Sequence, residues 1–135
     1  MKTKIVVTAL LIFSLSLYLI SLNLFQSSIG PHGGTVKLAG DYNIEMKSIY
    51  PNIYTFLLNK KNKPIINKKL SCEISFMLPN NTVINSQLKS FRDDGFIMEL
   101  GGLNFSSCRV FFNVLGKSVS AEFESENPIV EKKTK

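Results

Sequence analysis

The sequence is poor in the residues on which most enzyme mechanisms depend. Its 135 residues include one histidine, two cysteines and no tryptophan. No serine, threonine or cysteine has a nearby histidine in a recognisable nucleophile motif, and no glycine-rich loop precedes a helix that could bind phosphate. The length also excludes a multidomain enzyme, since one domain takes roughly 100–200 residues. We therefore expect a protein that is not an enzyme.

Charge is absent from one long stretch near the N-terminus. Residues 5–25 contain no charged side chain and follow two lysines. As a helix this run would span roughly 32 Å, close to the ~30 Å of a bilayer's hydrocarbon core. It is longer than the ~7–15 apolar residues of a cleavable signal, and Pro31 follows the only small-residue cleavage pattern. We expect one N-terminal hydrophobic helix within residues 1–30, acting as an uncleaved membrane anchor; a cleaved signal peptide is the alternative.

The positive residues before this run favour a cytoplasmic N-terminus, which places the rest of the chain outside. The expected location is the inner membrane facing the periplasm, or the periplasm itself if the segment is cleaved.

Acidic residues are absent from residues 59–69, which hold five lysines. No aromatic residue is interleaved with these lysines, and an exported domain does not meet nucleic acid. This stretch predicts a solvated hairpin tip that could touch anionic lipid or a partner's acidic patch.

No helical periodicity follows residue 30, and the dominant period is two. Apolar and polar residues alternate over residues 42–47, 70–78 and 118–124. Glycine, proline and asparagine separate these runs, as in turns. We expect an all-β fold over residues 31–124, an immunoglobulin-like antiparallel β-sandwich of seven or eight strands, with a small closed barrel as the alternative. Residues 125–135 are polar, and we expect a disordered tail.

The two cysteines occupy apolar positions of two predicted strands. Cys72 alternates in step with Leu70, Ile74 and Phe76, and Cys108 in step with Val110, Phe112 and Val114. Both should therefore point inward. An inward pair in an oxidising compartment predicts a Cys72–Cys108 disulfide between the sheets. Two buried free thiols, or a two-cysteine metal site, are the alternatives.

His32 lies in Pro31-His32-Gly33-Gly34, between the apolar run and the first alternating stretch. The glycines make a turn the simplest interpretation. Alternatively, the imidazole could be one ligand of a soft or borderline metal ion. Further ligands would have to come from Glu45, from another protein, or from Met46, Met77 and Met98. Core packing explains Met46 and Met98 more simply, because both alternate with polar neighbours. The adjacent carboxylates Asp93 and Asp94 are expected to form only a turn.

Three segments carry a resemblance to a known family. Residues 31–46 contain His-Gly-Gly, then Gly-Asp-Tyr, then Ile-Glu, and residues 54–64 and 116–123 add a strand with its turn and a closing hairpin. This pattern resembles a family of small exported bacterial proteins. Their immunoglobulin-like domains occur beside, or fused to, the periplasmic adaptors of heavy-metal efflux pumps. The resemblance implies a non-catalytic accessory in heavy-metal, copper-type handling, with an envelope efflux or adaptor protein as partner.

The metal ligands that the resemblance implies here are His32 and Glu45. Asn43 stands where these proteins often have a second histidine, and Asn59 where an aspartate is common. We therefore expect copper or zinc to bind only weakly, with no other cofactor. A structural or protein-interaction module of the cell envelope, with no metal role, is the alternative function.

Overall fold

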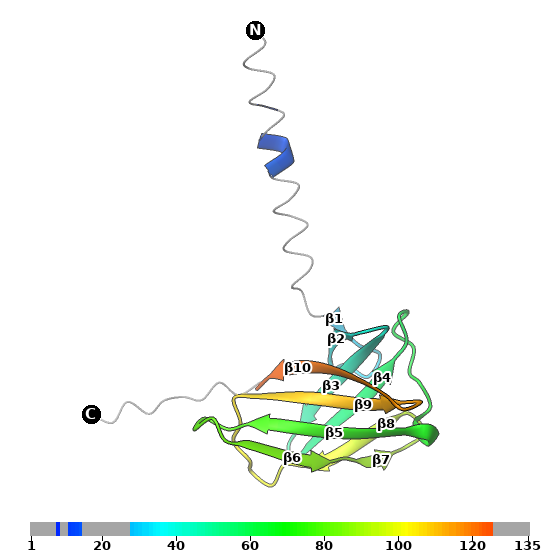
Figure 1. Ribbon diagram of the computed structural model, residues 1–135, viewed down its shortest axis with the longest axis vertical. Helices are drawn as coiled ribbons and strands as arrows, with labels where there is room; N and C mark the ends of the chain where they lie inside the picture. Colours follow the sequence, from blue (N-terminus) through cyan, green and yellow to red (C-terminus); the bar gives the residue numbers. More distant parts are fainter. Residues whose placement is uncertain (1–7, 9–10, 15–27, 126–135) are drawn as a thin grey trace, which may run out of the picture.

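The computed structural model describes residue 8, residues 11–14 and residues 28–125. Residues 28–125 form two antiparallel β-sheets, which confirms the all-β prediction (Figure 1). The strands are β1 (Ser28–Ile29), β2 (Thr35–Ala39), β3 (Tyr42–Ile49), β4 (Asn52–Leu58), β5 (Leu70–Met77), β6 (Val83–Gln87), β7 (Lys89–Phe91), β8 (Gly95–Glu99), β9 (Ser107–Val114) and β10 (Lys117–Glu124). A single 3₁₀ turn, η1 (Asn67–Lys69), joins β4 to β5 in this part of the chain.

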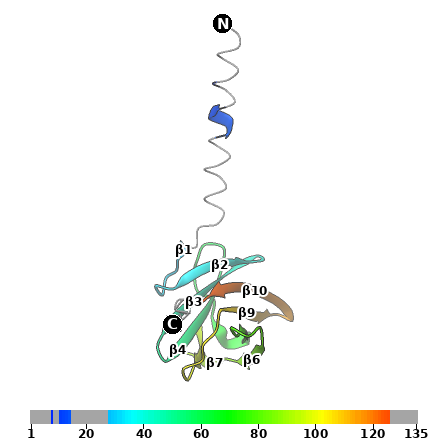
Figure 2. The ribbon, with the colours of Figure 1, turned by 90° about the vertical axis from the view of Figure 1, so that its left-hand side faces the viewer.

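These ten strands exceed the seven or eight that were predicted. The six-stranded sheet has the order β1-β2-β3-β4-β8-β7, and the four-stranded sheet has the order β10-β9-β5-β6. β1 and β7 are only two and three residues long, too short to show an alternating pattern in the sequence. β1 also belongs to the segment that the sequence assigned to the N-terminal anchor. Figure 2 shows the two sheets from another side, and buried residues from both sheets form one core cluster.

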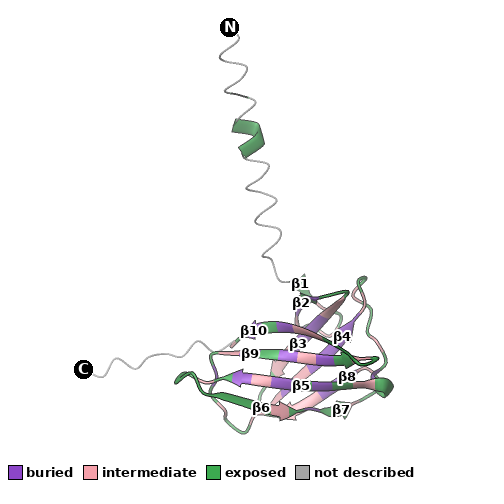
Figure 3. Cartoon of the chain, viewed as in Figure 1, coloured by how far each residue is buried: buried purple, intermediate pink, exposed green. Residues whose placement is uncertain are grey.

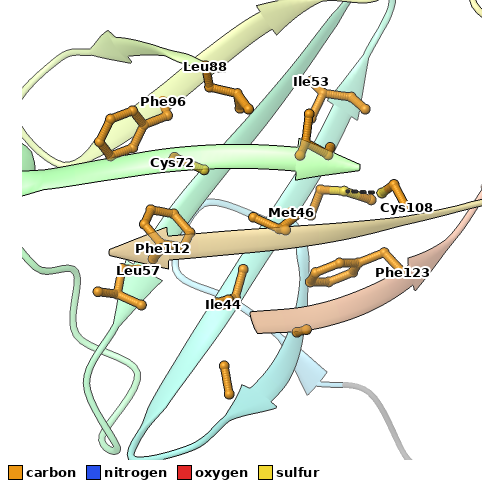
Figure 4. Close-up of a cluster of buried hydrophobic side chains, with 14 of the residues drawn as sticks. Ile44, Met46, Ile53, Leu57, Cys72, Leu88, Phe96, Cys108, Phe112 and Phe123 are labelled. Carbon is orange, nitrogen blue, oxygen red and sulfur yellow. Dashed lines mark hydrogen bonds between the residues drawn. The ribbon is translucent and has the colours of Figure 1, made fainter. Parts of the chain in front are cut away.

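The main core lies between the sheets and follows the predicted alternation. In β3, Ile44 and Met46 point inward, and in β5, Cys72, Ile74 and Phe76 do the same. Phe96 of β8 meets Phe112 of β9 edge to face across the sandwich, with ring centroids 5.6 Å apart (Figure 4). Burial of this apolar surface is the main force that holds the sheets together.

The outer face of the six-stranded sheet is not simply solvent-facing. Val36, Phe56 and Leu58 form a second, smaller cluster of buried residues on it. Glu45 lies in register between Val36 of β2 and Phe56 of β4, so it belongs to the same face. β3 and β4 each carry a run of consecutive buried residues, as expected of strands that are covered on both faces (Figure 3). The second cluster therefore creates a local interior outside the main core.

The predicted N-terminal hydrophobic helix falls mostly outside the described residues. Residue 8 and residues 11–14 are helical, and the described residues include no helix long and apolar enough to cross a membrane. The predicted tail, from residue 126 onward, also lies outside the described part of the chain.

The predicted disulfide is wrong, although both cysteines do point inward. Cys72 and Cys108 are buried free thiols. They lie on neighbouring strands of one sheet rather than on opposite sheets, because Cys72 pairs with Phe112 while Cys108 pairs with Phe76. The four-residue offset along β9 alone separates their Cα atoms by roughly 13 Å in the strand direction. A disulfide requires about 4.4–6.8 Å between Cα atoms.

Each thiol instead packs into the core next to a polar or polarisable group. Cys72 Sγ lies 3.2 Å from Thr55 Oγ1, and Cys108 Sγ lies 3.6 Å from Met46 Sδ (Figure 4). Burial raises the pKa of Cys72 from its ordinary value of 9.0 to about 12 and raises that of Cys108 to the same value. Both thiols therefore remain protonated, and they are poor nucleophiles and poor metal ligands.

We expect both thiols to be inert to a thiol reagent in the native protein and to react fully after unfolding without reductant.

The raised pKa values also predict a loss of stability at high pH, because the unfolded thiols ionise above pH 9 while the folded thiols do not until about pH 12. The free energy of unfolding should fall across this window, and it should fall less in a Cys72→Ala, Cys108→Ala double variant. Denaturant titrations at pH 8, 9 and 10 measure the difference. Equal slopes in the two proteins would contradict the prediction.

Candidate functional site

The centre of the candidate site is the carboxylate of Glu45, which has no exposure to solvent. Its Oε1 accepts hydrogen bonds from the backbone N–H groups of His32 and Gly34, each at 2.9 Å. Its Oε2 lies 2.7 Å from His32 Nδ1. A buried carboxylate is costly unless it is hydrogen-bonded, and these three contacts all come from the segment before β2. Glu45 therefore ties that segment to β3.

The ring of His32 is held on both edges and one face. Nδ1 faces Glu45, and Nε2 lies 2.9 Å from Oδ2 of Asp94. The ring stacks on Phe56 with a centroid distance of 3.6 Å and an angle of 7° between planes. The backbone carbonyl of His32 accepts a hydrogen bond from Lys47 Nζ at 2.8 Å. These contacts define one orientation of the imidazole, although the side chain remains 24% exposed.

Two glycines allow the segment to approach β3 this closely. A Cβ at Gly34 would lie 2.6 Å from the backbone oxygen of Met46, and a Cβ at Gly30 would collide with the carboxyl group of Glu45. Gly33 adopts a φ of +81°, a conformation that side chains disfavour. The backbone N–H of Gly30 donates to the carbonyl of Gly34, and that of Gly33 donates to the carbonyl of Gly30. The turn predicted around His32 is present, and it positions the imidazole.

Asp94 reaches the ring from the turn between β7 and β8. Asn67 of η1 fixes this turn, because its Nδ2 donates to the carbonyls of Arg92 and Gly95 at 3.0 and 2.8 Å. The backbone N–H of Asn67 donates to the carbonyl of Asp93. Asp93 and Asp94 form a turn as expected, but the second of the two carboxylates also contacts His32.

A cleft of about 460 Å³ opens beside the imidazole. It is lined by His32, Phe56, Pro64, Phe91, Arg92, Asp93 and Asp94. Three of these residues are apolar, and the charged ones come from the turn between β7 and β8. The guanidinium of Arg92 lies 5.1 Å from the ring centroid of Phe91. The Nε2 edge of His32 and the carboxylate of Asp94 therefore meet at the wall of an open cleft.

The structure brings the two predicted ligands together, but as hydrogen-bond partners. Glu45 and Asp94 face opposite nitrogens of His32, so the three side chains do not converge on one point. Accordingly, residues 28–125 and the few described before them contain no group of three histidine, cysteine, aspartate or glutamate side chains that could hold a metal ion. The prediction of a metal ligand at His32 stays a prediction.

The other residues considered as metal ligands make contacts that belong to the fold. Met46 and Met98 pack in the main core, and Met77 lies on β5 in the other sheet. Asn43, which the sequence pattern places where a second histidine was expected from the resemblance, donates from Nδ2 to Asn62 Oδ1 at 2.7 Å. Asn59 Oδ1 accepts from two backbone N–H groups of the following turn.

Sequence reasoning missed Asp94 and Phe56 as parts of the site. The contact between His32 and Asp94 joins residues 62 positions apart, and no local pattern encodes that distance. One signal was available in the sequence, because the predicted turns at residues 31–34 and 93–95 each carry polar side chains that could contact each other. Pairing those turns would have required the order of strands in the sheet.

Comparison of the chain with protein-family models, with curated protein sequences and with solved structures finds no match.

The contacts of His32 with Glu45 and with Asp94 should differ sharply in their contribution to stability. A His32→Ala substitution removes the contact with Asp94 and also one of three donors to the fully buried Glu45, and we expect it to lower the free energy of unfolding by about 2–3 kcal/mol. Asp94→Asn alters a partly exposed contact and should cost less than about 1 kcal/mol. Urea denaturation of the two variants measures both values. Similar losses would show that burial of Glu45 does not dominate the cluster.

Proposed function

We propose that this chain is a non-catalytic binding domain of the cell envelope, tethered to the membrane or exported, that acts as an accessory in heavy-metal handling. The domain would be an immunoglobulin-like sandwich, as the resemblance of residues 31–46 implies. One observation carries the proposal: the single histidine is held rigidly with its Nε2 edge at the wall of an open cleft. A fixed imidazole beside a carboxylate is a suitable partial site for a divalent transition-metal ion.

The donors at the cleft favour particular ions. Imidazole and carboxylate suit Zn²⁺ and Cu²⁺, whereas Cu⁺ prefers thiolate and thioether ligands. The thiols and Met46 are buried in the core, Met98 packs against it, and the partly exposed Met77 of β5 does not line the cleft. We therefore favour a divalent ion as the bound species.

The incompleteness of the site supports an accessory role. Tight transition-metal sites in proteins use three or four protein ligands, while the wall of this cleft offers an imidazole and the carboxylates of one turn. Ligands from a second protein, such as an efflux or adaptor component, would complete the coordination shell. An open partial site also permits the ion to pass to that partner.

The test is calorimetric titration of the full chain, in mild detergent, with Zn²⁺ and Cu²⁺. The matched variant is His32→Asn, whose side-chain amide can still donate to Glu45 but has no atom in the place of Nε2. We expect weak 1:1 binding to the wild type and a loss of at least about tenfold in affinity in the variant.

Two results would overturn the proposal. Tight binding that survives His32→Asn would place the metal elsewhere in the chain. Absence of binding in both proteins would favour the alternative, a protein-interaction module of the envelope, for which the apolar side chains of the same cleft offer a docking surface.

A further inference from the structure

We propose that a cation bound at this cleft is ligated by His32 Nε2 and Asp94, and that Glu45 is a positioning residue rather than a ligand. This assignment rests on the proposed function and replaces the ligand pair that the family resemblance implies. It is carried by the arrangement of two carboxylates on opposite edges of one imidazole.

Glu45 has no room to act as a ligand. Both of its oxygens already accept hydrogen bonds, and the side chain is completely buried under residues 30–34. An ion reaching it would have to displace His32 or the glycine segment. The contact of Glu45 with Nδ1 instead matches the arrangement in metal proteins where a carboxylate fixes the ring of a metal-bound histidine through its other nitrogen.

This contact determines which nitrogen faces the ion. An ionised carboxylate only accepts hydrogen bonds, so Glu45 holds Nδ1 as the donor. The lone pair of a neutral ring is then on Nε2, directed at Asp94. The 2.9 Å contact between Nε2 and Asp94 is a hydrogen bond when Nε2 carries a proton, and a metal ion can take the place of that proton. The charged groups around this position are Glu45 and Lys47 from β3 and Arg92, Asp93 and Asp94 from the turn, while β4 contributes the uncharged Phe56.

Nε2 and Asp94 Oδ2 are 2.9 Å apart, which is a hydrogen-bond distance. Zinc–nitrogen and zinc–oxygen bonds are about 2.0–2.2 Å long, so a tetrahedral ion holds two donor atoms about 3.4 Å apart, and the pair has to open before it can ligate. Asp94 is 29% exposed at the rim of the cleft, so a small rotation of its side chain can open the pair. Asp93, which lines the same cleft, has no hydrogen bond or ion pair to His32 in the described structure.

The decisive comparison is Asp94→Asn against Asp93→Asn, because each removes one negative charge from the same cleft. In the full chain we expect Asp94→Asn to weaken Zn²⁺ binding by at least about tenfold and Asp93→Asn to change it by less than about threefold. Glu45→Gln should weaken binding by about 10–100-fold, the usual range for a residue that orients a histidine ligand. If Glu45→Gln fails to fold, the two aspartate variants still decide the assignment.

A spectroscopic readout separates ligand from orienting residue. In nitrogen NMR of the wild-type imidazole, Zn²⁺ should move the Nε2 resonance strongly and the Nδ1 resonance only slightly. A strong shift of Nδ1, or equal effects of the two aspartate variants, would overturn the assignment of Asp94 while leaving a metal-binding function in place. Absence of Zn²⁺ binding by the wild type would instead overturn both proposals.

Discussion

The buried carboxylate of Glu45 is the interaction on which the arrangement of the site depends. It lies on the outer face of a sheet, where a charged side chain would ordinarily meet water. Here two backbone N–H groups and one imidazole replace that water. Because all three donors come from residues 32–34, the carboxylate holds the chain in place before β2 begins. The stacking of His32 on Phe56 and its contact with Asp94 follow from that placement.

The six-stranded sheet thereby uses both of its faces. Its inner face packs against the four-stranded sheet through the main core, and its outer face carries the smaller cluster of Val36, Phe56 and Leu58. β4 explains how one sheet can do this, since its last four residues are all buried on alternating sides. The inner cluster provides most of the apolar burial, while the outer one provides a dry support for the imidazole. Most of the apolar burial and the support of the imidazole thus lie on opposite faces of the same strands.

Alternation of residue types predicted β3, β5 and β10, because each side chain's face is a local property. It also predicted the inward direction of both cysteines. What it could not supply was the neighbour of each strand: Cys72 and Cys108 share a sheet, and that fact depends on β5 pairing with β9. Glu45 shows a related limit. The alternation in β3 correctly places its side chain on the other face of the sheet from Ile44 and Met46, but it does not reveal that residues 30–34 cover that side chain. Asp94 required the same non-local information.

The wide separation of His32 and Asp94 in the sequence affects when the site can exist. Their contact encloses β2 to β7, and closing a loop of 62 positions carries an entropic cost that nearby strand pairs do not bear. A hairpin such as β2–β3 can form without it, whereas the cleft requires that β8 has joined β4 and that β7 has joined β8. Any ligand that bridges the two residues consequently stabilises the finished sandwich against global unfolding rather than one hairpin against local fraying. In an incompletely folded chain His32 and Asp94 are not in contact, so a ligand cannot bridge them.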